Sequence, residues 1–262
     1  MGGLGNQLFE IAAAYAYARK TNKQLQLLHI TDNGNRPVYW NSILQKMNPY
    51  LISTLPNFPV HWSEDLPTMY KEIPAFSENV YLHGYLQSSK YYHTDAIKNE
   101  LKELFKPSDA LMKEVSDKYQ YLLDNKDRVV VVHARRTDYL RNAHMINFHG
   151  PLTSDYYEHA IEKMKGIVEN PIWLLSSDDN EFWKEVSTVQ SLSDVVIVNE
   201  SSDIHAFALL QQFQHYIISN STFIWWCTWL SNAKKVIAPS RWFGPTGPHP
   251  FEDIYEPEWE RI

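Results

Sequence analysis

The residues best suited to chemistry lie in one stretch, 128–139, whose sequence is RVVVVHARRTDY. The consecutive valines Val129 to Val132 predict a strand buried on both faces, as in a parallel sheet. Ligands of open α/β sheets bind outside the carboxyl ends of the strands, so a site is expected among the polar residues that follow: His133, Arg135, Arg136 and Asp138. Adjacent arginines are suited to bidentate binding of phosphate. The alternative is that they form ordinary surface ion pairs with nearby carboxylates.

Two other predicted strand ends carry polar clusters. Ser176 to Asp179 follow the apolar run IWLL, and a carboxylate there commonly accepts hydrogen bonds from a ribose hydroxyl or a base edge. A helix N-cap is an equally good explanation, and Asp178 and Asp179 can divide the two tasks. The second cluster opens a predicted helix, whose N-terminus is suited to phosphate: Ser219, Asn220, Ser221 and Thr222. Capping alone would explain one of these residues but not the whole run.

The amino-terminal residues MGGLGNQLFE combine a glycine-rich turn with the start of a helix. Such a turn lets backbone N–H groups approach an anion or another ligand closely. The equal alternative is that the glycines only permit a tight turn into the helix.

The elements that must position these residues follow from periodicity. After Asp124 the pattern alternates between strands at 128–133, 172–176, 195–198, 216–219 and 236–238 and helices at 154–166, 180–187, 203–213 and 222–232. This alternation predicts an α/β fold with a parallel, doubly wound sheet. Within the last helix, Trp225, Trp226 and Trp229 are more typical of buried packing than of ligand contacts.

The first half is less regular. Its predicted elements are helices at 8–19, 95–105 and 108–123, strands at 24–29 and 80–83, and a loop-rich segment at 31–79. We therefore expect two domains, an α/β half at 1–124 and a Rossmann-like half at 125–262.

Composition excludes several classes of function. The net charge of −7 argues against a nucleic-acid-binding protein. The single cysteine, Cys227, excludes an internal disulfide and any cysteine-based zinc site. Because neither a membrane-spanning run nor a signal-peptide pattern is present, a soluble, cytoplasmic protein without a transmembrane anchor is expected.

Nucleotide-binding motifs narrow the chemistry further. The chain has no P-loop, no G-x-G-x-x-G motif and no D-x-D pair that would hold a metal against a diphosphate. If the strand-end clusters bind a nucleotide diphosphate, the arginines have to neutralise it without a metal.

Four ordered motifs resemble those of a known family. HARRTDY at 133–139 resembles the H-x-R-R-x-D-Y motif shared by α1,2-, α1,6- and protein O-fucosyltransferases. GGLGNQLFE at 2–10, LLSSDD at 174–179 and ISNSTFIWWCTWL at 218–230 are similar to motifs of glycosyltransferase family 11, the α1,2-fucosyltransferases. The resemblance implies a two-domain GT-B fold with a nucleotide-sugar cleft between two Rossmann-like halves. It also implies an inverting, metal-independent transfer of L-fucose from GDP-β-L-fucose to a galactose hydroxyl of a glycan acceptor, without a further cofactor.

The resemblance also implies roles for individual residues. Arg136 would hold the β-phosphate of the leaving GDP, with support from Arg135. His133 and Asp138 would orient the donor and the loop. Asp138 is also the candidate catalytic base, and His149 is the reserve.

The resemblance implies that further residues contact the donor, GDP-fucose. Asp178 would contact guanine or ribose beside Ser177, and the diphosphate would be lined by Ser219, Asn220, Ser221 and Thr222. The facing wall of the cleft would be formed by Gly3, Gly5, Asn6 and Gln7.

The chain departs from the family pattern at its start. Family members have a hydrophobic strand before the glycine turn, whereas this sequence begins with the turn itself. Either the strand is lost, so that the first half on the acceptor side lacks it, or the start of the sequence was assigned too late. The membrane anchor of animal members is also missing, which favours a bacterial or viral type of enzyme. Two alternatives stay open: a transferase that uses another GDP-sugar, and an inactive sugar-nucleotide- or glycan-binding protein.

Overall fold

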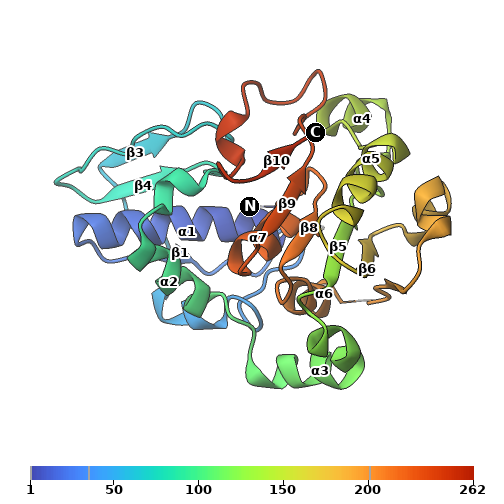
Figure 1. Ribbon diagram of the computed structural model, residues 1–262. Helices are drawn as coiled ribbons and strands as arrows, with labels where there is room; N and C mark the ends of the chain where they lie inside the picture. The colour runs from blue at the N-terminus through green and yellow to red at the C-terminus, as the bar shows by residue number, and fades with distance from the viewer. Residues whose placement is uncertain (1, 35, 201) are drawn as a thin grey trace. The chain divides into compact units, whose positions relative to one another are not determined.

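The computed structural model describes residues 2–34, 36–200 and 202–262 (Figure 1). The chain forms two compact units, one of Met1–Ser108 with Pro248–Glu256 and one of Asp109–Gly247 with Pro257–Ile262. The sequence analysis divides the chain at 124/125, whereas the structure assigns helix α3 (Asp109–Asp124) to the second unit, where it packs against α6 (Asp203–Leu210).

The second unit contains a six-stranded sheet in which all neighbouring strands are parallel. Its order is β10-β9-β8-β5-β6-β7, so the chain runs outward from β5 in one direction and then returns to build the other side from β8. The strands are β5 (Val129–Ala134), β6 (Ile172–Ser177), β7 (Val195–Ile197), β8 (His215–Ile217), β9 (Lys235–Ala238) and β10 (Glu260–Arg261). The prediction of an α/β fold with a parallel sheet is confirmed. The point between β5 and β8, where the strand order reverses, is where such sheets bind ligands.

The hydrophobic pattern explains why these segments form the centre of the sheet. The side chains of Val129 to Val132 are fully buried, as expected for a strand covered on both faces. Helix α5 (Ser154–Lys165) buries the face formed by Tyr157, Ala160, Ile161 and Met164, and helix α7 (Thr222–Leu230) is buried along most of its length. Trp225 and Trp226 are fully buried and Trp229 is 9% exposed, which confirms that they pack in the core.

Two segments of this unit differ from the prediction. The helix expected at 180–187 is replaced by two short 3₁₀ helices, η3 (Asn180–Lys184) and η4 (Ser187–Ser191). The run Val186–Val189 contains β-branched and hydroxyl side chains, which disfavour an α-helix, and Phe182 and Trp183 are already buried by the first turn. Helix α4 (Ala143–His149) and the short strand β10 were not predicted.

The first unit is built around the long helix α1 (Leu4–Thr21), which begins after Gly3 and ends at Asn22 in the left-handed region (φ 52°). It contains two separate two-stranded parallel sheets, β1 (Leu27–Leu28) with β2 (Leu51–Ile52) and β3 (Val60–Ser63) with β4 (Val80–His83). The other elements are α2 (Asp95–Leu104), η1 (Gln45–Tyr50), η2 (Ser89–Tyr92) and η5 (Glu252–Ile254). The strand predicted at 80–83 matches β4, whereas the one predicted at 24–29 is reduced to two residues.

Candidate active site

The site predicted at the carboxyl end of β5 begins with a link across the switch point. Nδ1 of His133 lies 2.8 Å from Oγ of Ser219, which follows β8, and its ring stacks on Phe223 with 5.9 Å between ring centres. The side chain is only 5% exposed, and this burial lowers the pKa of His133 to about 3. The imidazole is therefore neutral near pH 7, and its contact with Ser219 links the ends of β5 and β8.

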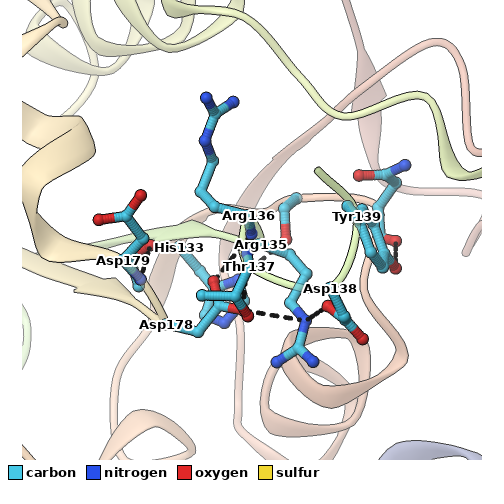
Figure 2. Close-up of polar contacts among 11 residues, drawn as sticks. His133, Arg135, Arg136, Thr137, Asp138, Tyr139, Asp178 and Asp179 are labelled. Carbon is cyan, nitrogen blue, oxygen red and sulfur yellow. Dashed lines mark hydrogen bonds and ion pairs between the residues drawn. The ribbon is translucent and has the colours of Figure 1, made fainter. Parts of the chain in front are cut away.

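The adjacent arginines point in opposite directions (Figure 2). Nε of Arg135 donates a hydrogen bond to Oδ1 of Asp138 (2.8 Å) and lies 3.3 Å from Oδ2 of Asp178. All of its polar contacts within the described residues use Nε, so the two terminal amino groups of Arg135 can bind a ligand. The ion pairs that the sequence analysis names as an alternative to phosphate binding are thus present, but they occupy only one of the three nitrogens.

Arg136 is engaged on the other side of the loop. Its guanidinium lies over the ring of Phe182 at 4.0 Å, and Nη1 donates to the carbonyl of Leu152 at 2.9 Å. Nε of Arg136 is buried and has no hydrogen-bond partner among the described residues. These contacts join the loop after β5 to the segments that follow it, and they hold Arg136 apart from Arg135.

Asp178 shapes the loop that carries both arginines. Its Oδ1 accepts a hydrogen bond from the backbone N–H of Arg136 (2.8 Å), and Oδ2 accepts from the backbone N–H of Thr137 (3.2 Å) and from the Thr137 hydroxyl. Both oxygens are thus used within the protein. The predicted contact of Asp178 with guanine or ribose stays a prediction.

The neighbouring residues Ser177 and Asp179 form a local turn. Asp179 is the N-cap of η3, where its Oδ1 accepts from the backbone N–H of Glu181 (3.2 Å), and its own N–H donates to Oγ of Ser177 (3.0 Å). The helix-capping task suggested for this pair therefore falls to Asp179.

The polar residues that follow β8 have two kinds of surroundings: some of their groups bind other parts of the protein, and others can bind a ligand. Asn220 is 3% exposed, and its Nδ2 donates to the carbonyls of His149 (2.6 Å), Trp242 (2.8 Å) and Gly150 (3.4 Å). Ser221 occupies the N-cap position of α7, followed by Thr222, but no side-chain hydrogen bond caps the helix there. The N-terminus of α7 thus retains backbone donors suited to an anion.

A contact missed by the sequence analysis fixes His149. The rings of Tyr139 and His149 stack with centres 4.0 Å apart and planes 4° apart, and the Tyr139 hydroxyl donates to the carbonyl of Asn220 at 2.9 Å. His149 is the last residue of α4, which ends at Gly150 in the left-handed region (φ 60°). The sequence signal for this helix end was the glycine directly after His149.

The glycine turn lies in the first unit, whereas the residues described above belong to the second. Gln7 is fully buried, and its Nε2 donates to the carbonyls of Gly2 and Pro37, both at 2.9 Å. Oδ1 of Asn6 accepts from Nε2 of Gln87 at 3.0 Å, and Gly5 is buried within α1. Gln7 therefore holds the turn in place from inside the unit.

Packing does not explain why residue 3 of this turn is a glycine. It has φ −66°, which any residue adopts, and a Cβ placed there would meet no heavy atom within 4 Å. The open space beside the helix N-terminus is consistent with the close approach of a ligand.

Neither a metal-ligand cluster nor a membrane-spanning helix is found in the part of the chain that the structure describes. Among residues 2–34, 36–200 and 202–262, no group of three or more His, Cys, Asp or Glu side chains is placed to hold a metal ion. Within the same ranges, every helix is too short or too polar to span a lipid bilayer.

Known proteins resemble this chain in sequence and in fold. An α-1,2-colitosyltransferase of Escherichia coli is 29% identical over all of this chain and 96% of its own length. Galactoside α-(1,2)-fucosyltransferase 2 of Hylobates lar is 26% identical over 98% of this chain and 74% of its own. The crystal structure of NodZ α-1,6-fucosyltransferase soaked with GDP-fucose superposes with a TM-score of 0.57 over 92% of both chains at 14% identity, which shows a shared fold.

The family model described as glycosyl transferase family 11 matches residues 1–262, the whole chain. This chain therefore belongs to glycosyltransferase family 11.

Proposed function

We propose that the chain transfers L-fucose from GDP-β-L-fucose to a galactose hydroxyl of a glycan, with inversion to an α1,2 linkage and without a metal. One observation carries the proposal: an uncapped helix N-terminus after β8 and an arginine with two available amino groups after β5 lie at the carboxyl ends of adjacent strands. Such a combination suits a diphosphate at a topological switch point.

The proposed donor contacts assign different tasks to the two arginines. Arg135 binds the β-phosphate through its terminal amino groups, and the backbone N–H groups at the start of α7, with Ser221 and Thr222, bind the diphosphate. Arg136 stabilises the loop through Phe182 and plays the lesser part in binding. This assignment reverses the order that the resemblance implies, because the guanidinium of Arg136 is already held by protein groups.

The other predicted residues support the proposed diphosphate contacts. His133 and Asp178 position the loop and the strand end, as their hydrogen bonds within the protein suggest. The glycine turn is the part of the first unit that the resemblance assigns to ligand binding. Gly3 and Asn6 would bind there, and the buried residues Gly5 and Gln7 would hold the turn in place, with the first half of the chain carrying the acceptor side. The open space beside Gly3 supports its part in ligand binding.

The reaction is a single displacement. The galactose hydroxyl oxygen attacks the anomeric carbon of fucose while the bond from that carbon to the β-phosphate oxygen breaks, and GDP leaves with the electron pair. Arg135 and the α7 N-terminus stabilise the charge that develops on the phosphate. The hydroxyl proton passes to the carboxylate of Asp138, whose Oδ1 is oriented by Arg135, or to His149.

GDP-colitose is a second candidate donor, because one of the relatives is an α-1,2-colitosyltransferase. The diphosphate contacts proposed above do not distinguish one GDP-sugar from another. A protein that binds the donor without turnover is the alternative outside the enzymes.

The test is donor turnover with a galactoside acceptor, for GDP-fucose, GDP-colitose, GDP-mannose and UDP-galactose, each with and without excess EDTA. We expect GDP-fucose to give an α1,2-linked product at a rate that EDTA leaves unchanged. A preference for GDP-colitose would identify it as the donor. Donor binding without turnover would show that the chain is a binding protein and not an enzyme. Loss of activity in EDTA that Mn²⁺ restores would contradict the metal-free mechanism.

A further inference from the structure

The loop that follows β4 in the first unit is held by hydrogen bonds along its whole backbone. The N–H groups of residues 85–88 all have an acceptor within the unit. The first two donate to the carboxylate of Glu64, Tyr85 to Oε1 at 2.6 Å and Leu86 to Oε2 at 2.9 Å. The next two donate to backbone carbonyls at 2.7 and 2.8 Å. The loop therefore has one fixed conformation.

This conformation includes two unusual backbone angles. Gly84 has φ 141° and Leu86 has φ 53°. A Cβ on Gly84 would lie 2.5 Å from Oε1 of Glu64, so the carboxylate can approach the loop only because residue 84 is a glycine. Leu86 is 2% exposed and packs in the core beside Trp62, which helps to hold its left-handed conformation. Backbone strain of this kind is found preferentially at active sites and ligand-binding segments.

Tyr85 lies between the two strained positions, and packing does not explain it. Its side chain is 38% exposed, whereas Leu86 beside it is buried. Within the described ranges, the Tyr85 hydroxyl makes no hydrogen bond. The loop thus holds a large aromatic ring at the surface, where both the ring and its hydroxyl can bind a ligand.

The location of this loop also favours a ligand. Glu64 directly follows β3 and Gly84 directly follows β4, and these two strands lie side by side as a parallel pair (Figure 1). Ligands of parallel α/β sheets bind outside the carboxyl ends of the strands. Nε2 of Gln87 donates to Oδ1 of Asn6 at 3.0 Å, which joins the loop to the glycine turn of the same unit.

We propose that Tyr85 is a specificity-determining residue whose ring stacks on a galactose residue of the acceptor glycan. Glu64 is the positioning residue that fixes the loop and thereby the ring. This inference rests on the proposed function, which requires a galactose-containing acceptor. The pairing suits both partners, because galactose has an apolar C–H face and a rim of hydroxyl groups, and tyrosine has a flat apolar ring and one hydroxyl.

The diphosphate of the donor is the competing ligand, and charge argues against it. The carboxylate of Glu64 is bound to the backbone N–H of Tyr85 itself, so it lies next to any ligand of the ring. A negative charge at this position repels a diphosphate but not a neutral glycan.

The test measures the KM for lactose, the KM for the GDP-sugar that the wild-type protein turns over, and Tm. Tyr85→Ala should raise the KM for lactose by about tenfold and leave the donor KM and Tm unchanged, because an exposed ring contributes little to folding. Tyr85→Phe keeps the ring and should raise the KM for lactose by only about threefold. Tyr121→Ala is the matched control: Tyr121 is a 51% exposed tyrosine of the second unit, and its loss should change neither KM.

Glu64→Gln tests the positioning role. The amide NH₂ cannot accept a hydrogen bond, so one of the two backbone N–H groups loses its acceptor. The KM for lactose should rise by about threefold or more at constant donor KM, which a merely structural role would not produce. In the double variant with Tyr85→Ala, the KM for lactose should equal that of Tyr85→Ala alone, because Glu64 acts through the ring.

An unchanged KM for lactose in Tyr85→Ala, or an equal rise in the lactose and donor KM values, would overturn the proposal. If the protein turns over no GDP-sugar, the proposed function fails, and ligand-observed NMR of lactose binding then decides this inference separately. Binding to the wild-type protein that Tyr85→Ala abolishes would support the stacking role. Equal binding to both proteins, or none to the wild type, would contradict it.

Discussion

At the scale of single residues, neighbouring side chains of one type have different surroundings and therefore different expected roles. Arg135 keeps two amino groups available beside Asp138, whereas Arg136 is held by Phe182 and the carbonyl of Leu152. Alternation along an extended segment explains why the two side chains point apart, but the motif cannot show which of them meets Phe182 and Leu152, because these partners lie elsewhere in the chain. The assignment of the phosphate contact to Arg135 is the direct consequence.

Alanine substitutions separate the two arginines. Arg135→Ala should weaken GDP binding by about 10- to 100-fold, since a charge-assisted hydrogen bond contributes about 1.5–3 kcal/mol. Arg136→Ala should change GDP affinity by less than about threefold, but it should lower the free energy of unfolding by about 1 kcal/mol through the lost ring and carbonyl contacts. Calorimetric titration and urea unfolding measure the two effects. The reverse ranking of GDP affinities would restore Arg136 as the main phosphate ligand.

His133 should make stability depend on pH. Burial holds its pKa near 3 in the folded protein against an ordinary value of 6.5, so between these values the unfolded chain binds a proton that the folded chain does not. The stability that His133 contributes is therefore complete above pH 6.5 and falls as the pH decreases towards 3. Between pH 6.5 and 4.5, the wild-type protein should lose about 2 kcal/mol more than His133→Asn in urea unfolding. Parallel pH profiles for the two proteins would show that the imidazole is not held neutral.

The variant Gly3→Ala tests whether glycine is needed at this position for ligand binding or for the backbone conformation of the turn. The backbone angles and the space beside Gly3 accommodate a methyl group, so Tm should be unchanged. If the donor approaches the α1 N-terminus, the added methyl group should raise the KM for GDP-fucose by about tenfold or more. An unchanged KM would place Gly3 away from the donor.

At the scale of elements, the site depends on a helix that has no buried face of its own. None of the residues of α4 is buried, so its sequence shows no apolar periodicity, and the sequence analysis could not detect it. Its carboxyl end is held instead by Asn220 and by close backbone packing between Gly150 and Gly244. This packing sets the position of His149.

Gly244→Ala tests that packing. A Cβ on Gly244 would lie 2.2 Å from the carbonyl oxygen of Asn147 and 2.9 Å from the backbone nitrogen of Gly150, so the chain has to move. We expect a loss of about 1–3 kcal/mol in stability and a fall in kcat, because His149 shifts with the helix end. Gly166→Ala is the matched control, since its Cβ would come no closer than 3.4 Å to another heavy atom. Equal Tm and kcat in both variants would contradict the role of this contact.

At the scale of the whole molecule, the sequence predicts the elements whose patterning is local. Four elements lie within about two residues of their predicted positions: the strands β5 and β6 and the helices α5 and α7. Their burial, on both faces for a strand or along one stripe for a helix, requires a pattern of apolar residues that can be recognised in the sequence. The strand β10 and the strands β2 and β3 of the loop-rich segment were missed, since such short strands depend on partners distant in the chain.

The candidate site was predicted as a set of residues but not as a set of roles. The motifs located His133, Asp178 and Asn220, yet each of them makes side-chain hydrogen bonds to other parts of the protein. Residue type alone does not distinguish an oxygen or nitrogen that orders a loop from one that binds a ligand. The groups left for a ligand, those of Arg135 and the α7 N-terminus, became identifiable only after the internal hydrogen bonds were assigned.

The most direct test of the central claim, a GDP-sugar site at the carboxyl ends of β5 and β8, is calorimetric titration of the wild-type protein with GDP and UDP. We predict saturable binding of GDP, at least about tenfold tighter than that of UDP, and competition between GDP and GDP-fucose for the same site. Equal affinity for the two nucleotides, or binding of neither, would contradict the account.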